Sequence, residues 1–258
     1  FVPAEDVPTQ SGKYVGNMVA GEVCEIGQNV TRFAVGDRVF CHGPACELVA
    51  RPQKAVTVFP ADLKEADAIC LDPAHIAFAA VRDARICLGD NVVVFGLGAI
   101  GQFVVQMLRA GGCMNVFAVD PIARRRELAC RLGATATFDP SNEDVALAIH
   151  DRLGGVGADK AIEASGNYPA LAESLRSVRK CARIVTLGYY KGRDNVLALG
   201  AEWLHNRLEL ICSMPDWDNP LREYPVWDRS RQWQAVIDLF RRGILTSDGV
   251  LDPIVPID

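Results

Sequence analysis

A run of apolar residues ends in three glycines in the stretch NVVVFGLGAIG, residues 91–101. Glycine allows tight turns and a close approach to the backbone, because it has no Cβ. In a turn between a strand and a helix, Gly96 would permit the reversal, Gly98 would leave room for a pyrophosphate, and Gly101 would let the helix pack closely on the strand. This spacing predicts a dinucleotide-binding loop.

The residues around these glycines support the same chemistry. Leu97 lies within the loop, and the first N–H groups of the following helix, at Ala99 and Ile100, would bind the phosphates. An acidic residue, Asp120, ends the next apolar stretch of the chain. A GxGxxG motif alone is weak evidence, but the strand before it, the helix after it and the acidic residue beyond make it specific.

The type of dinucleotide depends on the charges near its ribose. The carboxylate of Asp120 would accept hydrogen bonds from a ribose 2′-OH and would repel a 2′-phosphate, so NAD is favoured over NADP. The arginines at 124–126 argue against this preference for NAD, because such a run could hold a 2′-phosphate. Arg125 is therefore included in the predicted cofactor site. Such a run more often forms a solvated helix face. A doubly wound domain that binds no dinucleotide is the alternative.

The elements that position these residues alternate between apolar strands and helices from residue 91 onward. Continuous apolar strands separated by helices are typical of a parallel sheet covered on both faces. The fold class is therefore α/β, and six strands in this arrangement predict a doubly wound Rossmann domain. We expect strands at 91–95, 115–119, 135–138, 159–164, 182–188 and 208–213, and helices at 99–110, 122–132, 142–152, 169–179 and 200–206.

The sequence on either side of this alternation has a different character. Short β-type runs, separated by Gly, Pro, Asn and Asp, predict a small all-β, barrel-like domain within residues 12–60. An alanine-rich helical stretch follows at 65–84, and an amphipathic helix is expected at 229–243. Neither end of the chain resembles the end of a domain, so we expect further sequence beyond both. The β-type runs are 21–27, 37–41, 46–51 and 55–59.

Composition and charge narrow the class of protein. The 258 residues are 50% hydrophobic and carry a formal net charge of -5, which gives no nucleic-acid footprint. No apolar run is long enough to span a membrane. The nine cysteines are an odd number without a CxxC pair, which indicates reduced thiols and a cytoplasmic protein. Cys41, His42 and Cys46 form a local cluster of metal-ligand types, but their spacing is loose for zinc.

Several motifs together resemble the medium-chain dehydrogenase/reductase family, in particular its zinc-type alcohol and polyol dehydrogenase branch. They are GEVCEIGQNVTRFAVGDRV, GLGAIGQ, IEASGN and IVTLG, in order along nearly the whole chain. The resemblance implies a GroES-like β-barrel catalytic domain at residues 1–77, which the chain rejoins at 215–258, around a Rossmann domain at 78–214. It also implies hydride transfer in the cleft between the domains, a small-molecule substrate, and a homodimer or homotetramer joined through the Rossmann domain.

The same resemblance implies further residues of the cofactor site. Ser165 and Gly166 at one strand end, with Gly188 and Tyr189 at the next, would line the nicotinamide half of the site. Quinone and enoyl reductases of the family usually have a glycine-doubled loop instead, so the loop in this chain favours the alcohol dehydrogenase side.

The stretch GNMVAGEV, residues 16–23, departs from the family's pattern at the metal site. Zinc-using members have a histidine and a glutamate where this chain has Asn17 and Met18. An amide is a poor zinc ligand, and a thioether prefers softer metals. A further ligand position falls at Asp72, whose carboxylate does not make a zinc site by itself. We therefore predict no bound metal, and we assign catalysis to His75, Asp72 and Asn17, since a histidine can move a proton near neutral pH.

Together these features predict an NAD(H)-dependent oxidoreductase that interconverts a secondary alcohol, polyol-like or cyclic, and a ketone without zinc. Two alternatives stay open. One is a metal-free reductase of an activated C=C bond, and the other is a non-catalytic dinucleotide-binding protein.

Overall fold

The computed structural model describes residues 16–192, 195–215 and 221–255. The contacts between residues divide the chain into two units. Unit 2 runs from Cys70 to Asp252, and unit 1 comprises the residues before it with a short segment after it. The domain limits at 77/78 and 214/215 follow the family's catalytic and cofactor domains, and they stay a prediction.

Unit 2 alternates strands and helices along most of its length. Within the described residues, no helix has both the length and the apolar character needed to cross a membrane. The strands are β4 (Asn91–Phe95), β5 (Asn115–Val119), β6 (Ala136–Phe138), β7 (Ala158–Glu163), β8 (Val178–Thr186) and β9 (Glu209–Cys212). The helices are α2 (Leu71–Asp83), α3 (Ala99–Ala110), α4 (Ala123–Leu132), α5 (Val145–Arg152), α6 (Tyr168–Arg176), α7 (Glu202–His205) and α8 (Arg229–Arg241).

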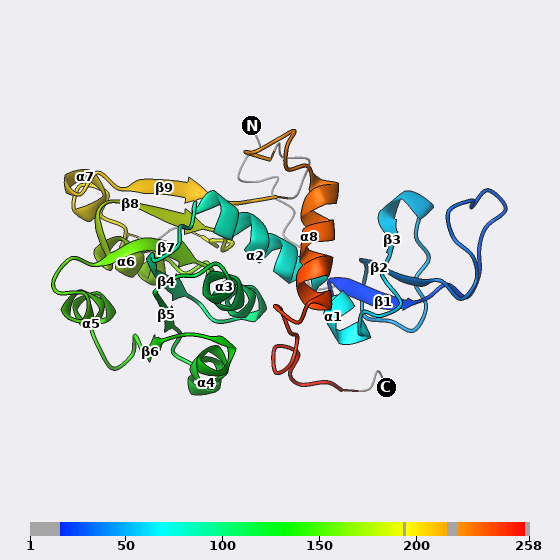
Figure 1. Cartoon of the computed structure of the whole chain (residues 1–258), viewed down its shortest axis with the longest axis horizontal. Coiled ribbons are helices and arrows are strands. Elements are labelled where there is room, and N and C mark those ends of the chain that lie inside the picture. The colour runs from blue at the N-terminus through cyan, green and yellow to red at the C-terminus, as the bar shows by residue number, and fades with distance from the viewer. Residues whose placement is uncertain (1–15, 193–194, 216–220, 256–258) are drawn as a thin grey trace. The chain divides into compact units, whose positions relative to one another are not determined.

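The six strands form one parallel sheet in the order β6-β5-β4-β7-β8-β9. This is the strand order of a Rossmann domain, in which the direction of winding reverses between the first and fourth strands. Here that reversal lies between β4 and β7, which are neighbours in the sheet (Figure 1). Ligands of doubly wound domains bind beyond the carboxyl ends of the strands at this point, so the loops after β4 and β7 are where a cofactor is expected.

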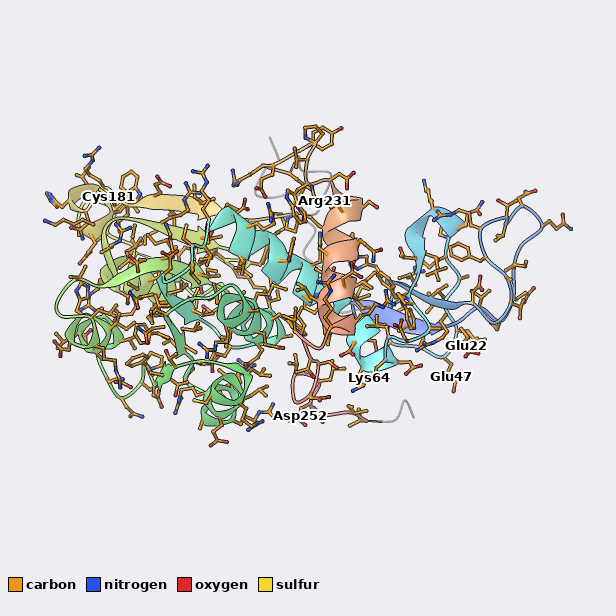
Figure 2. The ribbon with its side chains drawn as sticks, viewed as in Figure 1. Glu22, Glu47, Lys64, Cys181, Arg231 and Asp252 are labelled. Carbon is orange, nitrogen blue, oxygen red and sulfur yellow. The ribbon has the colours of Figure 1, made fainter. Side chains whose placement is uncertain are left out.

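The core of unit 2 explains why its central strands β4 and β5 are continuous apolar runs after their first residue. On one face of the sheet, Val93, Phe95 and Phe117 pack in a buried cluster with Ile149 of α5 and Leu171 of α6. The alternate residues of the same strands are buried as well, because α2 and α3 cover the other face of the sheet (Figure 1). The side chains of Figure 2 fill the space between these layers. Burial of each large apolar side chain contributes about 1.5–3 kcal/mol.

The predicted elements of unit 2 are confirmed, with corrections at their limits. The helix predicted at 169–179 ends at Arg176, because Ser177 caps it and Val178 already pairs with Ala158 of β7. The helical stretch at 65–84 is two helices rather than one, since Cys70 separates α1 (Glu65–Ile69) from α2.

Unit 1 contains a small antiparallel sheet in the order β1-β2-β3. Its strands are β1 (Met18–Glu22), β2 (Arg38–His42) and β3 (Val56–Val58). The short helix η1 (Gln53–Ala55) directly precedes β3. The all-β prediction is confirmed for these runs, but the strand predicted at 46–51 is wrong, and only the start of the run at 21–27 belongs to a strand. Arg51, the last residue of the run at 46–51, donates from its guanidinium to the carbonyl of His42 at 2.8 Å.

Candidate cofactor site

The loop after β4 has the space and the turn that a pyrophosphate requires. Gly96 adopts a left-handed φ of +86° and donates its N–H to the carbonyl of Val119 at 2.9 Å. Gly98 is the N-cap of α3, and no atom lies within 4 Å of the place that a Cβ would occupy. At Gly101 a Cβ would lie 1.9 Å from the Gly96 carbonyl oxygen. Helix α3 can therefore pack on the loop only because Gly101 has no side chain, whereas the space beside Gly98 is open.

Asp120 follows β5 directly and connects that strand to the glycine loop. Its carboxylate, only 3% exposed, accepts hydrogen bonds from the N–H groups of Leu97 and Ile122, each at 2.8 Å. An ionised carboxylate has about four acceptor positions. The two backbone bonds fix its orientation and leave acceptor capacity for the hydroxyls of a ribose.

The arginines at 124–126 do not form a free cationic patch. Each of the three side chains lies next to a carboxylate of unit 2, so a phosphate would have to compete with an existing ion pair. The pairs are Arg124–Asp252 at 2.6 Å, Arg125–Asp120 at 3.4 Å and Arg126–Asp139 at 3.1 Å.

A buried glutamate joins the loops after β7 and β8. Glu163, the last residue of β7, is fully buried. Its carboxylate accepts hydrogen bonds from the N–H of Ser165 at 2.7 Å and the N–H of Gly166 at 3.3 Å. It also accepts from the hydroxyls of Ser165 and Tyr190. Hydrogen bonds to an ionised group are about twice as strong as neutral ones, so this carboxylate holds two loops at the carboxyl edge of the sheet.

These two loops also touch through their backbones. A Cβ on Gly166 would lie 2.7 Å from the carbonyl oxygen of Tyr189, and one on Gly188 would lie 2.1 Å from the N–H nitrogen of Gly166. The side chains of Ser165 and Tyr189 are exposed. Burial and the nearby Glu163 carboxylate raise the pKa of Tyr190 well above its usual value, so its hydroxyl stays protonated and donates.

The residues assigned to catalysis lie in different parts of the chain. Asp72, 4% exposed, is in the first turn of α2, where the helix dipole favours a negative charge. His75 is fully buried one turn later, and its ring stacks on Trp233 of α8 with centroids 4.7 Å apart. Asn17 is exposed in unit 1, and its carbonyl accepts from the N–H of Gly43 at 3.0 Å. The packing of His75 gives it a structural role, and the catalytic role of all three residues stays a prediction.

The donor set of the described residues does not fit a catalytic zinc ion. At the positions where zinc-using relatives have histidine and glutamate, Asn17 offers an amide and Met18 a thioether. Within the ranges that the structure describes, no group of three or more His, Cys, Asp or Glu side chains is arranged so that it could hold a metal ion. This finding includes Cys41, His42 and Cys46.

The structure adds two residues that the sequence interpretation missed. Glu163 had a visible signal, since it is an acidic residue at the end of a strand, directly before the loop that contains Ser165 and Gly166. Gln102 of α3 had none. Its buried side-chain amide donates to the carbonyls of Leu97 at 3.1 Å and Arg125 at 2.9 Å, and so ties the glycine loop to the start of α4.

Known dehydrogenases are similar to this chain in sequence and in fold. A family model described as "Zinc-binding dehydrogenase" matches residues 99–219. The chain is 38% identical over 252 residues to D-guloside 3-dehydrogenase of Escherichia coli (strain K12), covering 95% of this chain and 71% of that protein. The crystal structure of galactitol-1-phosphate dehydrogenase from Escherichia coli superposes with a TM-score of 0.77 at 20% identity, over 92% of this chain and 75% of that one. That of 2R,3R-butanediol dehydrogenase from Bacillus subtilis gives 0.71 at 24% identity, over 89% and 69%.

The strand order, the glycine loop and these likenesses define an NAD(P)-dependent, alcohol dehydrogenase-like oxidoreductase. The chain belongs to the zinc-type medium-chain dehydrogenase/reductase family.

Proposed function

We propose that the protein uses NAD(H) to interconvert a secondary alcohol, polyol-like or cyclic, and the corresponding ketone, without a catalytic zinc ion. The observation that carries the proposal is the loop after β4, where the open space beside Gly98 adjoins the start of α3 and the buried carboxylate of Asp120 holds the loop's N–H.

The chain's own groups divide the work of holding the cofactor. The first N–H groups of α3 bind the pyrophosphate beside Gly98, and Asp120 accepts from the ribose hydroxyls. The loops held by Glu163 present Ser165 and Tyr189 to the nicotinamide. When bound, NAD supplies the acceptor for the hydride that leaves the alcohol carbon, while the hydroxyl proton passes to a base.

The preference for NAD over NADP rests on local charge. Asp120 would repel a 2′-phosphate, and Arg125 is already paired with that carboxylate. A 2′-phosphate would bring a further negative charge to a site whose cations have partners.

The substrate class is supported by one relative and by no contact in the structure. The name of the 38% identical protein, D-guloside 3-dehydrogenase, refers to a sugar derivative and a numbered position on it. A ring with several secondary hydroxyls fits the predicted cyclic, polyol-like substrate. We also propose a homodimer or homotetramer joined through the Rossmann unit, in which β9 is an edge strand of the sheet.

The absence of zinc is the second part of the proposal, and it rests on Asn17 and Met18. With no strong metal donor at these positions, side chains must handle the hydroxyl proton. Asp72 and His75 on α2 and Asn17 before β1 are the residues to test first.

Steady-state turnover separates this proposal from its alternatives. The protein would be assayed with NAD and with NADP against secondary alcohols, cyclic polyols and sugar glycosides, and in reverse with ketones and enones. We expect NAD-dependent oxidation of a cyclic polyol or glycoside. Activity on enones alone would support reduction of a C=C bond instead. NADH binding without turnover of any of these compounds would support a non-catalytic binding protein.

A further inference from the structure

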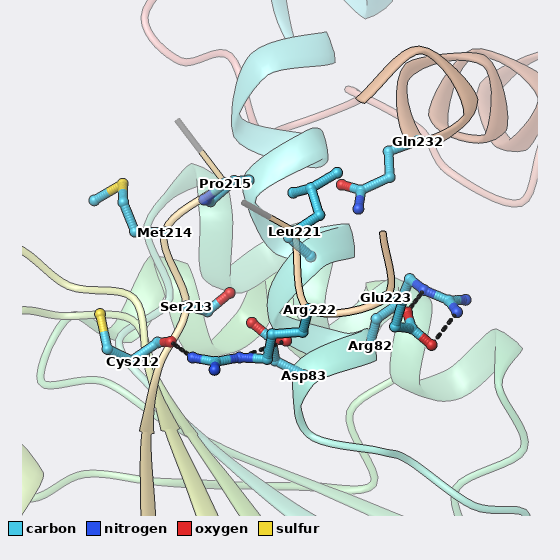
Figure 3. A pocket seen from close by; sticks show the side chains of 11 residues that line it. Arg82, Asp83, Cys212, Ser213, Met214, Pro215, Leu221, Arg222, Glu223 and Gln232 are labelled. Atoms are coloured by element: carbon cyan, nitrogen blue, oxygen red, sulfur yellow. Dashed lines mark hydrogen bonds and ion pairs between the residues drawn. The ribbon is translucent and has the colours of Figure 1, made fainter. Parts of the chain in front are cut away.

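A cavity of about 280 Å³ lies wholly within unit 2, beside the carboxyl end of β9 (Figure 3). Its described walls come from the last turns of α2, the segments 212–215 and 221–223, and the first turns of α8. The volume is close to the lower limit for small-molecule pockets in proteins, about 300 Å³. A molecule of hexose size fits such a space.

Two buried polar side chains of this cavity have unsatisfied atoms. Among the described residues, the hydroxyl of Ser213, 1% exposed, and the amide oxygen of Gln232, 4% exposed, have no hydrogen-bond partner. Both line the cavity, and Figure 3 shows them on opposite sides of it. A buried polar atom without a partner costs about 1–3 kcal/mol, so the two atoms are places where a ligand hydroxyl would be stabilised.

The charged groups of the wall are, in contrast, already paired. Arg82 binds both carboxylate oxygens of Glu223, at 2.5 and 2.7 Å, and its guanidinium lies 3.8 Å from the ring centre of Trp227. Arg222 lies 3.0 Å from Asp83 and also donates to a backbone carbonyl. The two positive charges and two negative charges cancel. A charged ligand would meet only charges that are already paired, so the wall would offer it no net electrostatic attraction.

The rest of the wall is apolar. Ala79, Cys212, Met214, Pro215 and Leu221 complete the described lining around the polar groups. The cavity therefore combines a hydroxyl, an amide and balanced charges with hydrocarbon surface. Neutral molecules that carry several hydroxyls on a carbon skeleton have this same mixture, because their O–H groups both donate and accept while their C–H faces pack on apolar side chains.

We infer that this cavity is a binding site for a neutral polyhydroxy compound, with Ser213 and Gln232 as its hydrogen-bonding residues. The inference uses residues of unit 2 alone and does not rest on the proposed function, because binding here needs neither cofactor nor turnover.

Isothermal titration calorimetry without NAD tests the site, using D-sorbitol and myo-inositol as probes. D-gluconate is the charged comparison, since it has about the size of D-sorbitol. We expect saturable binding of at least one polyol and weaker binding of D-gluconate. Loss of one neutral hydrogen bond should weaken polyol binding about threefold or more in Ser213→Ala, and similarly in Gln232→Leu.

Matched controls distinguish a site from a general effect on the protein. Ser174→Ala removes a buried hydroxyl that bonds to the carbonyl of Leu171 at 2.7 Å, and Gln234→Leu changes an exposed glutamine of α8. Both controls should bind the polyol like the wild type. Without ligand, Ser174→Ala should lower the melting temperature, whereas Ser213→Ala should leave it unchanged or raise it, because its hydroxyl has no partner to lose.

Three results would overturn the inference. The first is the absence of saturable polyol binding by the wild type, which would mean that the cavity holds water only. The second is polyol binding by both cavity variants that equals that of the wild type. The third is binding of D-gluconate that is as tight as polyol binding or tighter. If Gln232→Leu does not fold, Ser213→Ala gives the same test alone.

Discussion

The cofactor loop of unit 2 and the stretch before β1 in unit 1 differ in how their chemistry is made. The shape of the loop depends mainly on backbone groups. It is formed by glycines, by the N-terminus of a helix and by one carboxylate, and this chain has all three. The metal site of zinc-using relatives depends on individual donor side chains, and here Asn17 stands where those relatives have a histidine ligand. A site made of single side chains can be altered by one substitution, whereas a loop made of backbone groups is less sensitive to sequence.

The largest expected effects come from two glycines of the same loop that differ in their surroundings. Gly101→Val would place its Cβ against the Gly96 carbonyl and should destabilise the fold by about 3 kcal/mol or more. Gly98→Val meets no atom within 4 Å, at a φ of -69° that any residue adopts, and should fold. It should nevertheless lose NADH binding, because the new side chain occupies the pyrophosphate's space. Thermal melts and fluorescence titration with NADH measure the two effects, and tight NADH binding by folded Gly98→Val would reject the loop as the cofactor site.

A smaller effect is expected at the ribose. Asp120→Ala removes a charged acceptor, and hydrogen bonds to charged groups contribute about 1.5–3 kcal/mol each. NADH affinity should fall tenfold or more, while the penalty against NADPH becomes smaller. Asp120→Asn keeps an oxygen for the backbone N–H of Leu97 and removes only the charge, so it separates ribose recognition from support of the loop. Equal NADH affinity in both variants and the wild type would exclude Asp120 from the site.

A several-fold effect is expected at the other half of the site. Glu163→Gln replaces an acceptor of four hydrogen bonds by a group with one oxygen and one donor, so the loops after β7 and β8 should loosen. NADH binding should weaken, but ADP-ribose, which lacks the nicotinamide, should bind as it does to the wild type. Equal weakening of both ligands would show that Glu163 acts on the whole fold rather than on the nicotinamide half.

The smallest expected effect is a change in thiol reactivity that reports on helix α3. Burial, with a smaller contribution from Asp90, raises the pKa of Cys113 to about 11. Because the thiolate is the reactive form, alkylation of Cys113 at pH 8 should be slow and should accelerate as the pH rises towards that value. The exposed Cys130 and Cys181 should react first. Cys113 should stay protected in Gly98→Val and become reactive in Gly101→Val, and protection in both would contradict the packing assigned to Gly101.

The sequence alone predicts most of unit 2, because the central strands have continuous apolar runs and the other strands alternate with helical stretches. It also predicts the glycine loop and Asp120, since backbone function depends on local spacing. The bond of Glu163 to Tyr190 was not predictable, because it joins two loops that meet only when β7 and β8 pair. Unit 1 was predicted less well for the same reason. The run at 46–51 has β-type composition, but a strand also needs a neighbour to pair with.

The central claim is that this chain keeps the cofactor site of its family while the metal site is altered. It is tested most directly by measuring NADH binding, zinc content and turnover on one sample, before and after treatment with a chelator. The account predicts about one NADH bound per chain, zinc far below one per chain, and turnover that the chelator does not change. Stoichiometric zinc that is lost together with activity on chelation would contradict it, and Asp72 would then be the first ligand to test.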